Sequence, residues 1–434
     1  MIDVVTAFLM VAVIIIIGYF GMILFKKTKI SELIILMVIG LLIGPIFNLL
    51  GPAELAIFQS FLPFFAAFAL IIILFEGGMQ LNFFKAIRSV GDAFGFTILV
   101  FLINLILVVG ALWLIAEFNI IQFDLLTGLL VAAIIGGTSS AIIIPLVKNA
   151  SAREETKTLL NLESALTDAL CVITAVAVAE VMLIGSVSVT QIGAGILANF
   201  TIAAVVGFVA GLLWLRLLSY LQGKSYEYLM TIAALLLIYS IVELFKGNGA
   251  IAALVFGLVL GNSVDITTML KLRVRQIDNS IKSFQNEISF LVRTFFFVYL
   301  GILLKVEYLT KEVILISVAI IVIIIISRYF GAKILGILKP IFKPDTKLIT
   351  TMSARGLAAA VLVSLPMSMG LNIALPILDQ ITAIAFIVIF LSNILTTIGI
   401  FISEKGKPKN MDEEKKDILK EIKVESSPEK TTKK

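Results

Sequence analysis

Long apolar stretches recur along the whole chain, separated by short polar segments and by glycine and proline. Each is close to the roughly 20 residues that a bilayer crossing needs. A transmembrane barrel would instead show alternating segments of about 10 residues. The sequence therefore predicts an all-α polytopic membrane protein with 13 transmembrane helices. Their expected ranges are 3–25, 31–50, 57–80, 90–116, 124–148, 159–184, 190–218, 226–244, 248–262, 287–304, 311–337, 346–369 and 378–402.

The overall composition excludes a soluble protein and several kinds of chemistry. Apolar residues make up 60% of the chain and charged residues 15%, against about 25% charged residues in a soluble domain. There are no histidines, and Cys171 is the single cysteine. These counts exclude a histidine-ligated metal, a Ser-His-Asp triad, a histidine-held haem and a disulfide framework. We expect no cofactor and no nucleic-acid partner.

The positive charges of the loops predict the orientation of the chain. Connections after odd-numbered spans carry about 18 Lys and Arg, and those after even-numbered spans about 3. Positive loops stay in the cytoplasm. The amino terminus is therefore expected outside and the carboxyl terminus inside the plasma membrane. The amino terminus also lacks the positive segment of a cleaved signal peptide, so we expect the first span to be retained.

Two polar segments lie outside the predicted spans. Residues 403–434 hold about 10 Lys and about 8 acidic residues and are expected to form a charged cytoplasmic tail. A solubilising role and a regulatory role are both compatible with this composition. Residues 263–286 are polar and basic and are expected to form an amphipathic linker helix.

Ionisable residues inside the spans point to the function, because they are costly there and mark ion or proton paths. With no large soluble domain, the open classes are channel, secondary transporter, intramembrane enzyme and receptor. Glu180, near the outer end of the sixth span, is expected to reach the membrane interface. The other candidates are Glu76, Glu163, Asp168, Arg293, Arg328 and Arg355.

The sixth span carries oxygen ligands on one face. Ser164 and Asp168 are four residues apart, as are Glu163 and Thr167, so each pair shares a helix face. Such oxygens suit Na⁺ or K⁺. Arg328 lies at the depth of Glu163, which predicts a structural ion pair. Asp168 lies about 7–8 Å deeper with no evident partner, and burial favours its uncharged form, which suits a proton carrier.

Two spans are expected to be broken. The fifth contains residues 136–140 (Gly-Gly-Thr-Ser-Ser) followed by Pro145, and the twelfth contains residues 353–356 (Ser-Ala-Arg-Gly) followed by Pro366. Broken backbone is tolerated at membrane depth only where it is buried in protein or lines a cavity. The two spans hold corresponding places in helices 1–6 and 8–13. Two inverted six-helix repeats with interrupted helices are the best sequence pointer to a transporter site.

Four motifs resemble those of the monovalent cation/proton antiporter superfamily, and specifically its prokaryotic NhaP-type sodium/proton antiporters. They are Leu-Phe-Glu-Gly-Gly at 74–78, Glu-Ser-Ala-Leu-Thr-Asp at 163–168, Phe-Leu-Val-Arg-Thr-Phe-Phe-Phe-Val-Tyr-Leu-Gly at 290–301 and Ala-Arg-Gly-Leu at 354–357. The resemblance covers nearly the whole membrane region. It implies an NhaA-like antiporter fold, a role in pH homeostasis and a homodimer.

The resemblance also implies how the domain 1–402 is divided. Helices 1–3 and 7–10 would form a dimerising interface domain. Helices 4–6 and 11–13 would form a core that moves past this interface domain in the bilayer.

The resemblance assigns roles to individual residues. Asp168 would bind cation and proton alternately. The remaining Na⁺ ligands would be the Ser164 side chain, the Thr138 carbonyl group and, through water, Glu76. Glu163 and Arg328 would form a structural ion pair. The supporting residues would be Thr167, Ser139, Arg355 and Arg293.

Two departures from the family pattern bear on ion choice. Thr167 precedes Asp168 where the family usually has Asn, and Ser139 and Ser140 follow Thr138 where it usually has Asp-Pro. The second departure looks more like the potassium-efflux branch. With no second carboxylate, one proton per cation and electroneutral exchange are the simplest expectation.

Three alternatives remain open beside Na⁺/H⁺ exchange. The first is K⁺/H⁺ exchange on the same fold. The second is a cation channel, although channels usually need a wide polar pore or a symmetric filter. The third, a membrane enzyme, lacks a nucleophile–base pair, so we expect no enzymatic activity. Separately, Arg293 is expected either to pair with Glu76 or to extend toward the membrane surface.

Overall fold

The computed structural model describes residues 4–28, 31–49, 51–81, 91–118, 120–148, 150–184, 189–221, 226–269 and 279–404. In these ranges the chain is helical, with no β-strand. The first half contains α1 (Val4–Thr28), α2 (Glu32–Leu41), η1 (Leu42–Ile46), α3 (Pro52–Gln80), α5 (Gly91–Glu117), α6 (Leu125–Ile134), α7 (Ser140–Lys148), α8 (Glu154–Ile184) and α9 (Val189–Leu221).

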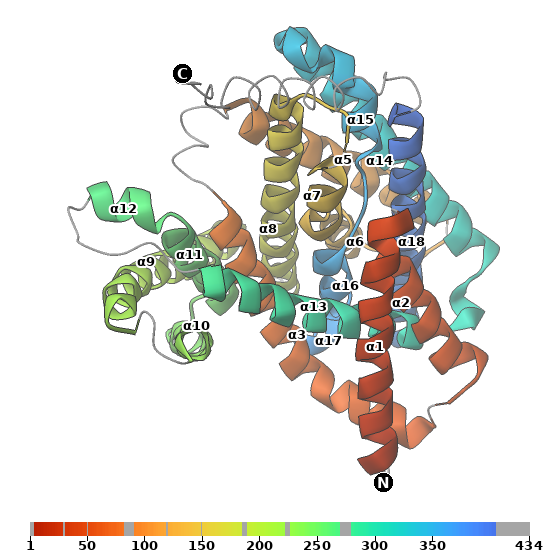
Figure 1. The fold of residues 1–434 in the computed structure, drawn as a ribbon. Coiled ribbons are helices and arrows are strands. Elements are labelled where there is room, and N and C mark those ends of the chain that lie inside the picture. Colours follow the sequence, from red (N-terminus) through yellow and green to blue (C-terminus); the bar gives the residue numbers. More distant parts are fainter. Residues whose placement is uncertain are drawn as a thin grey trace, which may run out of the picture.

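The second half continues in the same way (Figure 1). It contains α10 (Glu227–Leu244), α11 (Gly249–Gly261), α12 (Ser263–Met269), α13 (Asn279–Leu303), η2 (Val306–Tyr308), α14 (Lys311–Leu338), η3 (Pro340–Asp345), α15 (Thr346–Thr351), α16 (Leu357–Leu362), α17 (Leu365–Ser368) and α18 (Leu375–Glu404). The charged tail from residue 405 onward lies outside the described residues, as does the middle of the predicted linker helix, residues 270–278.

Eight of the described helices are long and apolar enough to cross a membrane, or nine if α11 and α12, bent by 74°, are one crossing. The other predicted spans correspond to shorter or interrupted helices. Both expected interruptions are present: α6 and α7 are separated by residues 135–139, and α15 and α16 by residues 352–356. We call these segments the first break and the second break.

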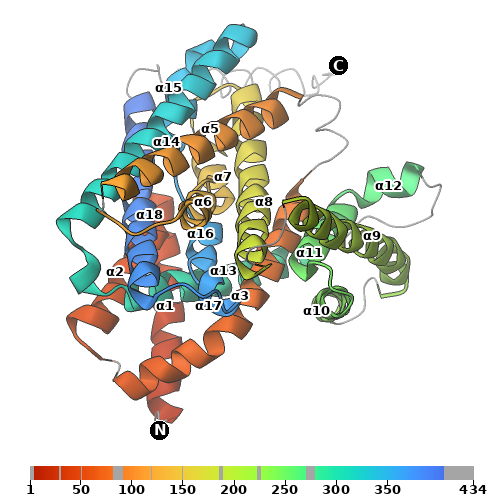
Figure 2. The same ribbon diagram turned by 180° about the vertical axis from the view of Figure 1, so that it is seen from behind.

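The helices pack around two apolar cores. The smaller core joins α3 to α9, α10 and α11, and the larger one joins α3 to α5–α8, α13–α18 and α2. Figures 1 and 2 show α9–α12 grouped at one side of the molecule, away from α5, α14 and α18. Glycines allow α3 and α11 to touch closely: a Cβ on Gly78 would meet the Leu254 carbonyl oxygen, and one on Gly257 would meet that of Phe75. Such small-residue contacts are typical of helices packed within membranes.

Large apolar side chains cover the outward faces of the long helices. An aqueous surface would not normally carry so many of them together, whereas a lipid surface does. Examples on α5, α9 and α14 are Trp113, Leu197, Leu213, Leu315 and Ile337.

Candidate ion-binding site

The two breaks cross each other in direct contact. The Ser139 N–H of the first break donates to the Ala354 carbonyl oxygen of the second, with 2.8 Å between nitrogen and oxygen. A Cβ on Gly356 would overlap the Ser139 side chain, so glycine allows the close approach. The half-helices α7 and α16 both begin beside this crossing. Their amino-terminal ends carry partial positive charge.

Asp168 on α8 lies at the start of α7. Its Oδ2 accepts the Ser140 N–H at 3.1 Å and the Ser140 hydroxyl at 2.7 Å. A carboxylate at a helix amino terminus balances the dipole and uses an N–H that lacks a partner inside the helix. Asp168 is partly buried, while its neighbour Thr167 is fully buried. The site therefore combines a carboxylate, a hydroxyl and a helix end. Ser140 was not among the residues predicted from the sequence.

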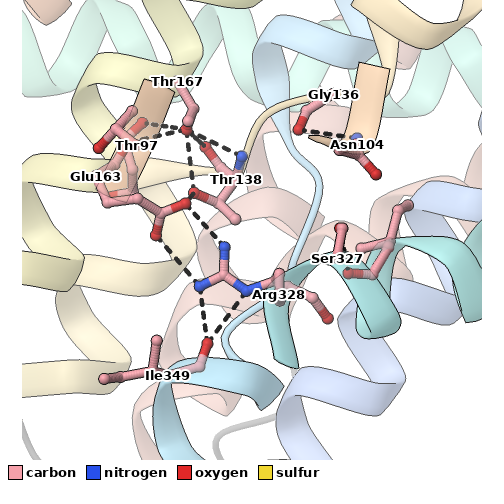
Figure 3. Close-up of polar contacts among 12 residues, drawn as sticks. Thr97, Asn104, Gly136, Thr138, Glu163, Thr167, Ser327, Arg328 and Ile349 are labelled. Carbon is pink, nitrogen blue, oxygen red and sulfur yellow. Dashed lines mark hydrogen bonds and ion pairs between the residues drawn. The ribbon is translucent and has the colours of Figure 1, made fainter. Parts of the chain in front are cut away.

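A buried ion pair stands next to this site (Figure 3). Arg328 Nη1 lies 2.8 Å from Glu163 Oε1, and Nη2 lies 3.3 Å from Oε2. The Thr138 hydroxyl of the first break donates to Glu163 Oε1 at 3.1 Å. Arg328 Nε and Nη2 donate to the Ile349 carbonyl oxygen in the last turn of α15, at 3.1 and 2.9 Å. A buried ion pair needs such additional hydrogen bonds to offset the cost of removing its charges from water. The network links the first break, α8, α14 and α15.

The predicted hydroxyl ligand Ser164 and the predicted supporting residue Thr167 are both bonded to groups other than Asp168. Ser164, one turn before Asp168, donates to the Asn161 carbonyl oxygen of its own helix at 3.1 Å. Thr167 Oγ1 accepts the Thr138 N–H at 3.1 Å and lies 3.3 Å from the Thr138 carbonyl oxygen. Thr167 therefore holds the backbone of the first break against α8.

Glu76 on α3 is bound from a neighbouring helix. Its Oε2 accepts the Ser289 hydroxyl of α13 at 2.5 Å, and its Oε1 accepts the Gln80 amide at 3.0 Å. Arg293 pairs with Glu32 on α2 rather than with Glu76, because its Nε lies 3.1 Å from Glu32 Oε1; its extension toward the membrane surface stays a prediction. A count of depth along each helix does not show which neighbouring helix an arginine faces.

Glu180, near the end of α8, binds the residue that caps α11, and its position at the membrane interface stays a prediction. Its Oε1 accepts the Asn248 amide at 3.3 Å. Both residues line a cavity of about 190 Å³ that also contains Glu243 and Tyr239. Asn248 also caps α11 by accepting the Ile251 N–H at 3.0 Å. The cap fixes the asparagine that binds Glu180.

The second break is held by α18. The Ser353 N–H donates to the Thr396 hydroxyl at 3.2 Å, and the Arg355 N–H to the Ser392 hydroxyl at 3.1 Å. The Asn393 amide donates to the Arg355 carbonyl oxygen at 2.8 Å. Arg355 itself is buried, and its Nε donates to none of the described residues. The polar residues 392, 393 and 396 within an apolar span were the available sequence signal for this anchor.

Interrupted helices that meet beside an intramembrane carboxylate are typical of secondary transporters. A family model described as "Sodium/hydrogen exchanger, transmembrane" matches residues 10–403. The chain therefore belongs to the sodium/hydrogen exchanger family. This membership supports cation/proton antiport as its activity.

Similar proteins are known from Methanocaldococcus jannaschii. A protein described as "Probable Na(+)/H(+) antiporter 2" from Methanocaldococcus jannaschii is 25% identical over 343 residues, which cover 75% of each chain. The solved sodium proton antiporter MjNhaP1 of the same organism, at pH 8, is similar with a TM-score of 0.77 at 20% identity, over 93% of this chain and 99% of that one. An electron-microscopy structure of MjNhaP1 gives 0.70 at 20% identity, over 94% of this chain and 100% of that one. These structures support the fold.

Proposed function

We propose that this protein exchanges a monovalent cation, Na⁺ or Li⁺, for a proton, and that cation and proton compete for Asp168. The observation that carries the proposal is the carboxylate of Asp168 at the start of α7, beside the crossing of the two breaks. The family assignment and the antiporter names of the relatives support the same activity.

In the proposed cycle, the loaded and the protonated carboxylate cross the membrane because their charge is reduced, whereas the empty carboxylate resists crossing. Thr167 stands where a second carboxylate would add a proton, so one proton per cation and electroneutral exchange follow. Glu163 and Arg328 hold the site together, and Ser139, Thr167, Arg355 and Arg293 support it. The proposed cation ligands are Asp168, Ser164, Thr138 and, through water, Glu76.

The proposed architecture has 13 crossings. The interrupted pairs α6–α7 and α15–α16 would be the fifth and twelfth crossings, in two inverted repeats of six. Helices 1–3 and 7–10 would form the interface of a homodimer and helices 4–6 and 11–13 the moving core. The amino terminus would lie outside the plasma membrane and the tail inside.

Exchange in proteoliposomes tests the proposal directly. An imposed pH gradient should drive uptake of Na⁺ and Li⁺ in the wild type, and Asp168→Asn should abolish it. The control is Asp379→Asn, which makes the same chemical change in a carboxylate paired with partly exposed Lys305 and should retain exchange. Sodium exchange by Asp168→Asn would contradict the proposal. A current proportional to turnover would contradict only the electroneutral stoichiometry.

Exchange of K⁺ for protons is the second candidate. Ser139 and Ser140 stand where the family usually has Asp-Pro, so the acidic residue expected there is missing. The same vesicles distinguish it: a response to KCl with none to NaCl would decide for K⁺. Cation flux at channel rates that is indifferent to the pH gradient would instead indicate a channel.

A further inference from the structure

Asp168 has one engaged oxygen and one open oxygen. Both hydrogen bonds from Ser140 go to Oδ2. Among the described residues no donor is bonded to Oδ1, and Asp168 is partly exposed rather than fully buried. Oδ1 is therefore open to a cation, and the Ser140 hydroxyl lies at the other oxygen of the same carboxylate.

The backbone of the crossing fixes the place of Ser140. The preceding N–H, that of Ser139, is used by the Ala354 carbonyl oxygen of the second break. The N–H groups of Ile142 and Ile143 turn back to the Ser139 carbonyl oxygen, at 3.2 and 2.9 Å. Ser140 is the first residue of α7, so its N–H has no acceptor within the helix and is left for Asp168. Its bond to Oδ2 does not depend on the serine side chain, so the hydroxyl is a separate contribution.

Of the hydroxyls in and beside the first break, the Ser140 hydroxyl is the one bonded to Asp168. The Thr138 hydroxyl is bonded to Glu163, and the Ser164 hydroxyl to a carbonyl oxygen of its own helix. Hydroxyl oxygens are suitable ligands for hard cations.

We propose that the Ser140 hydroxyl is a cation ligand and sets the preference among monovalent cations. This inference rests on the proposed antiport at Asp168. When a cation arrives, the hydroxyl proton turns away from Oδ2 and the oxygen lone pairs face the ion, while the Ser140 N–H stays on Oδ2. Cavity size and ligand number decide between similar cations. Because Ser140 Oγ lies 2.7 Å from Oδ2, the hydroxyl is within reach of an ion bound at the carboxylate, and an added short-range oxygen ligand favours the smaller ions Na⁺ and Li⁺ over K⁺.

The test is a matched set of substitutions at one position, measured as exchange with Na⁺, Li⁺ and K⁺. Ser140→Thr and Ser140→Val have nearly the same shape and differ in the hydroxyl. Ser140→Val and Ser140→Ala should raise the apparent KM for Na⁺ about tenfold, with a smaller effect on kcat, and Ser140→Thr should stay within about twofold of the wild type. The preference for Na⁺ over K⁺ should shrink in the Val and Ala variants.

A control separates this effect from the general loss of a hydrogen-bonded serine. Ser317 on α14 is buried and bonded to the Val313 carbonyl oxygen of its own helix, so Ser317→Ala should keep the wild-type KM. Ser140→Ala is the smaller variant, and it still tests the inference if the branched variants, Ser140→Thr and Ser140→Val, do not fold.

Two results would overturn the inference: an unchanged KM in both Ser140→Ala and Ser140→Val, or equal behaviour of Ser140→Thr and Ser140→Val. The proposed function fails separately, if the wild type does not exchange or if Asp168→Asn does. If the wild type exchanges, Asp168→Asn does not, and the Ser140 substitutions leave the KM unchanged, only this inference fails.

Discussion

The two breaks cross at one point but are held by different means. Side chains of α8 hold the first break at Thr138, because Glu163 accepts the Thr138 hydroxyl and Thr167 accepts the Thr138 N–H. The second break is held through its backbone, by hydroxyl and amide groups of α18. The first break therefore contacts the polar residues of α8, while the second is anchored to those of α18. Two similar interruptions need not share one role.

Their charges differ as well. The first break has no charged residue, and the carboxylate of Asp168 faces the α7 end. The second break contains the buried Arg355, while Arg328 donates to the last turn of α15. Cations stabilise the carboxyl-terminal end of a helix and anions its amino-terminal end. Asp168 thus lies at the amino-terminal end of α7 and Arg328 at the carboxyl-terminal end of α15, the ends that their charges stabilise.

The largest effect is expected at the buried ion pair that joins the first break to α15. Glu163→Gln leaves Arg328 without its charged partner and should lower the free energy of unfolding by about 3–5 kcal/mol. Thermal unfolding in detergent measures it. The control on the same helix is Glu154→Gln, which removes an exposed pair with Lys157 and should cost less than about 1 kcal/mol. Equal shifts in the two variants would argue against a structural role for the buried pair.

A smaller effect is expected at the crossing itself. Gly356→Ala places a methyl group on the Ser139 side chain and should destabilise the fold by about 1–3 kcal/mol. Gly95→Ala on α5 is the control, since no atom lies within 4 Å of the added Cβ. Unchanged unfolding of Gly356→Ala would show that the breaks can separate without cost.

The smallest effect is expected at the anchor of the second break. Ser392→Ala leaves the buried Arg355 N–H without an acceptor and should cost about 1–3 kcal/mol, toward the lower end because neighbouring bonds remain. Ser317→Ala should shift the unfolding midpoint less, since it leaves no N–H unpaired. If Ser392→Ala matched that control, the anchor would not depend on this hydroxyl.

Contacts along one helix, or between two helices at equal depth, could be predicted from the sequence. Both interruptions lie where glycine and hydroxyl residues gather within apolar runs. Counting depth brings Glu163 and Arg328 to the same level, and the structure has them in contact. The bonds from Ser140 to Asp168 and from Arg293 to Glu32 depend on how helices turn toward one another. Depth along a helix and spacing in the sequence do not show how each helix is rotated about its own axis relative to its neighbours.

The position of α3 between two cores has a consequence for its length. Ile71, Ile72 and Phe75 pack into the smaller core, while Leu70 and Leu74 pack into the larger one. One inserted residue would rotate every later position by about 100°. Such an insertion would exchange residues between the cores and turn Glu76 away from Ser289. The register of α3 should therefore tolerate an insertion poorly, because two cores and the Glu76–Ser289 contact depend on it.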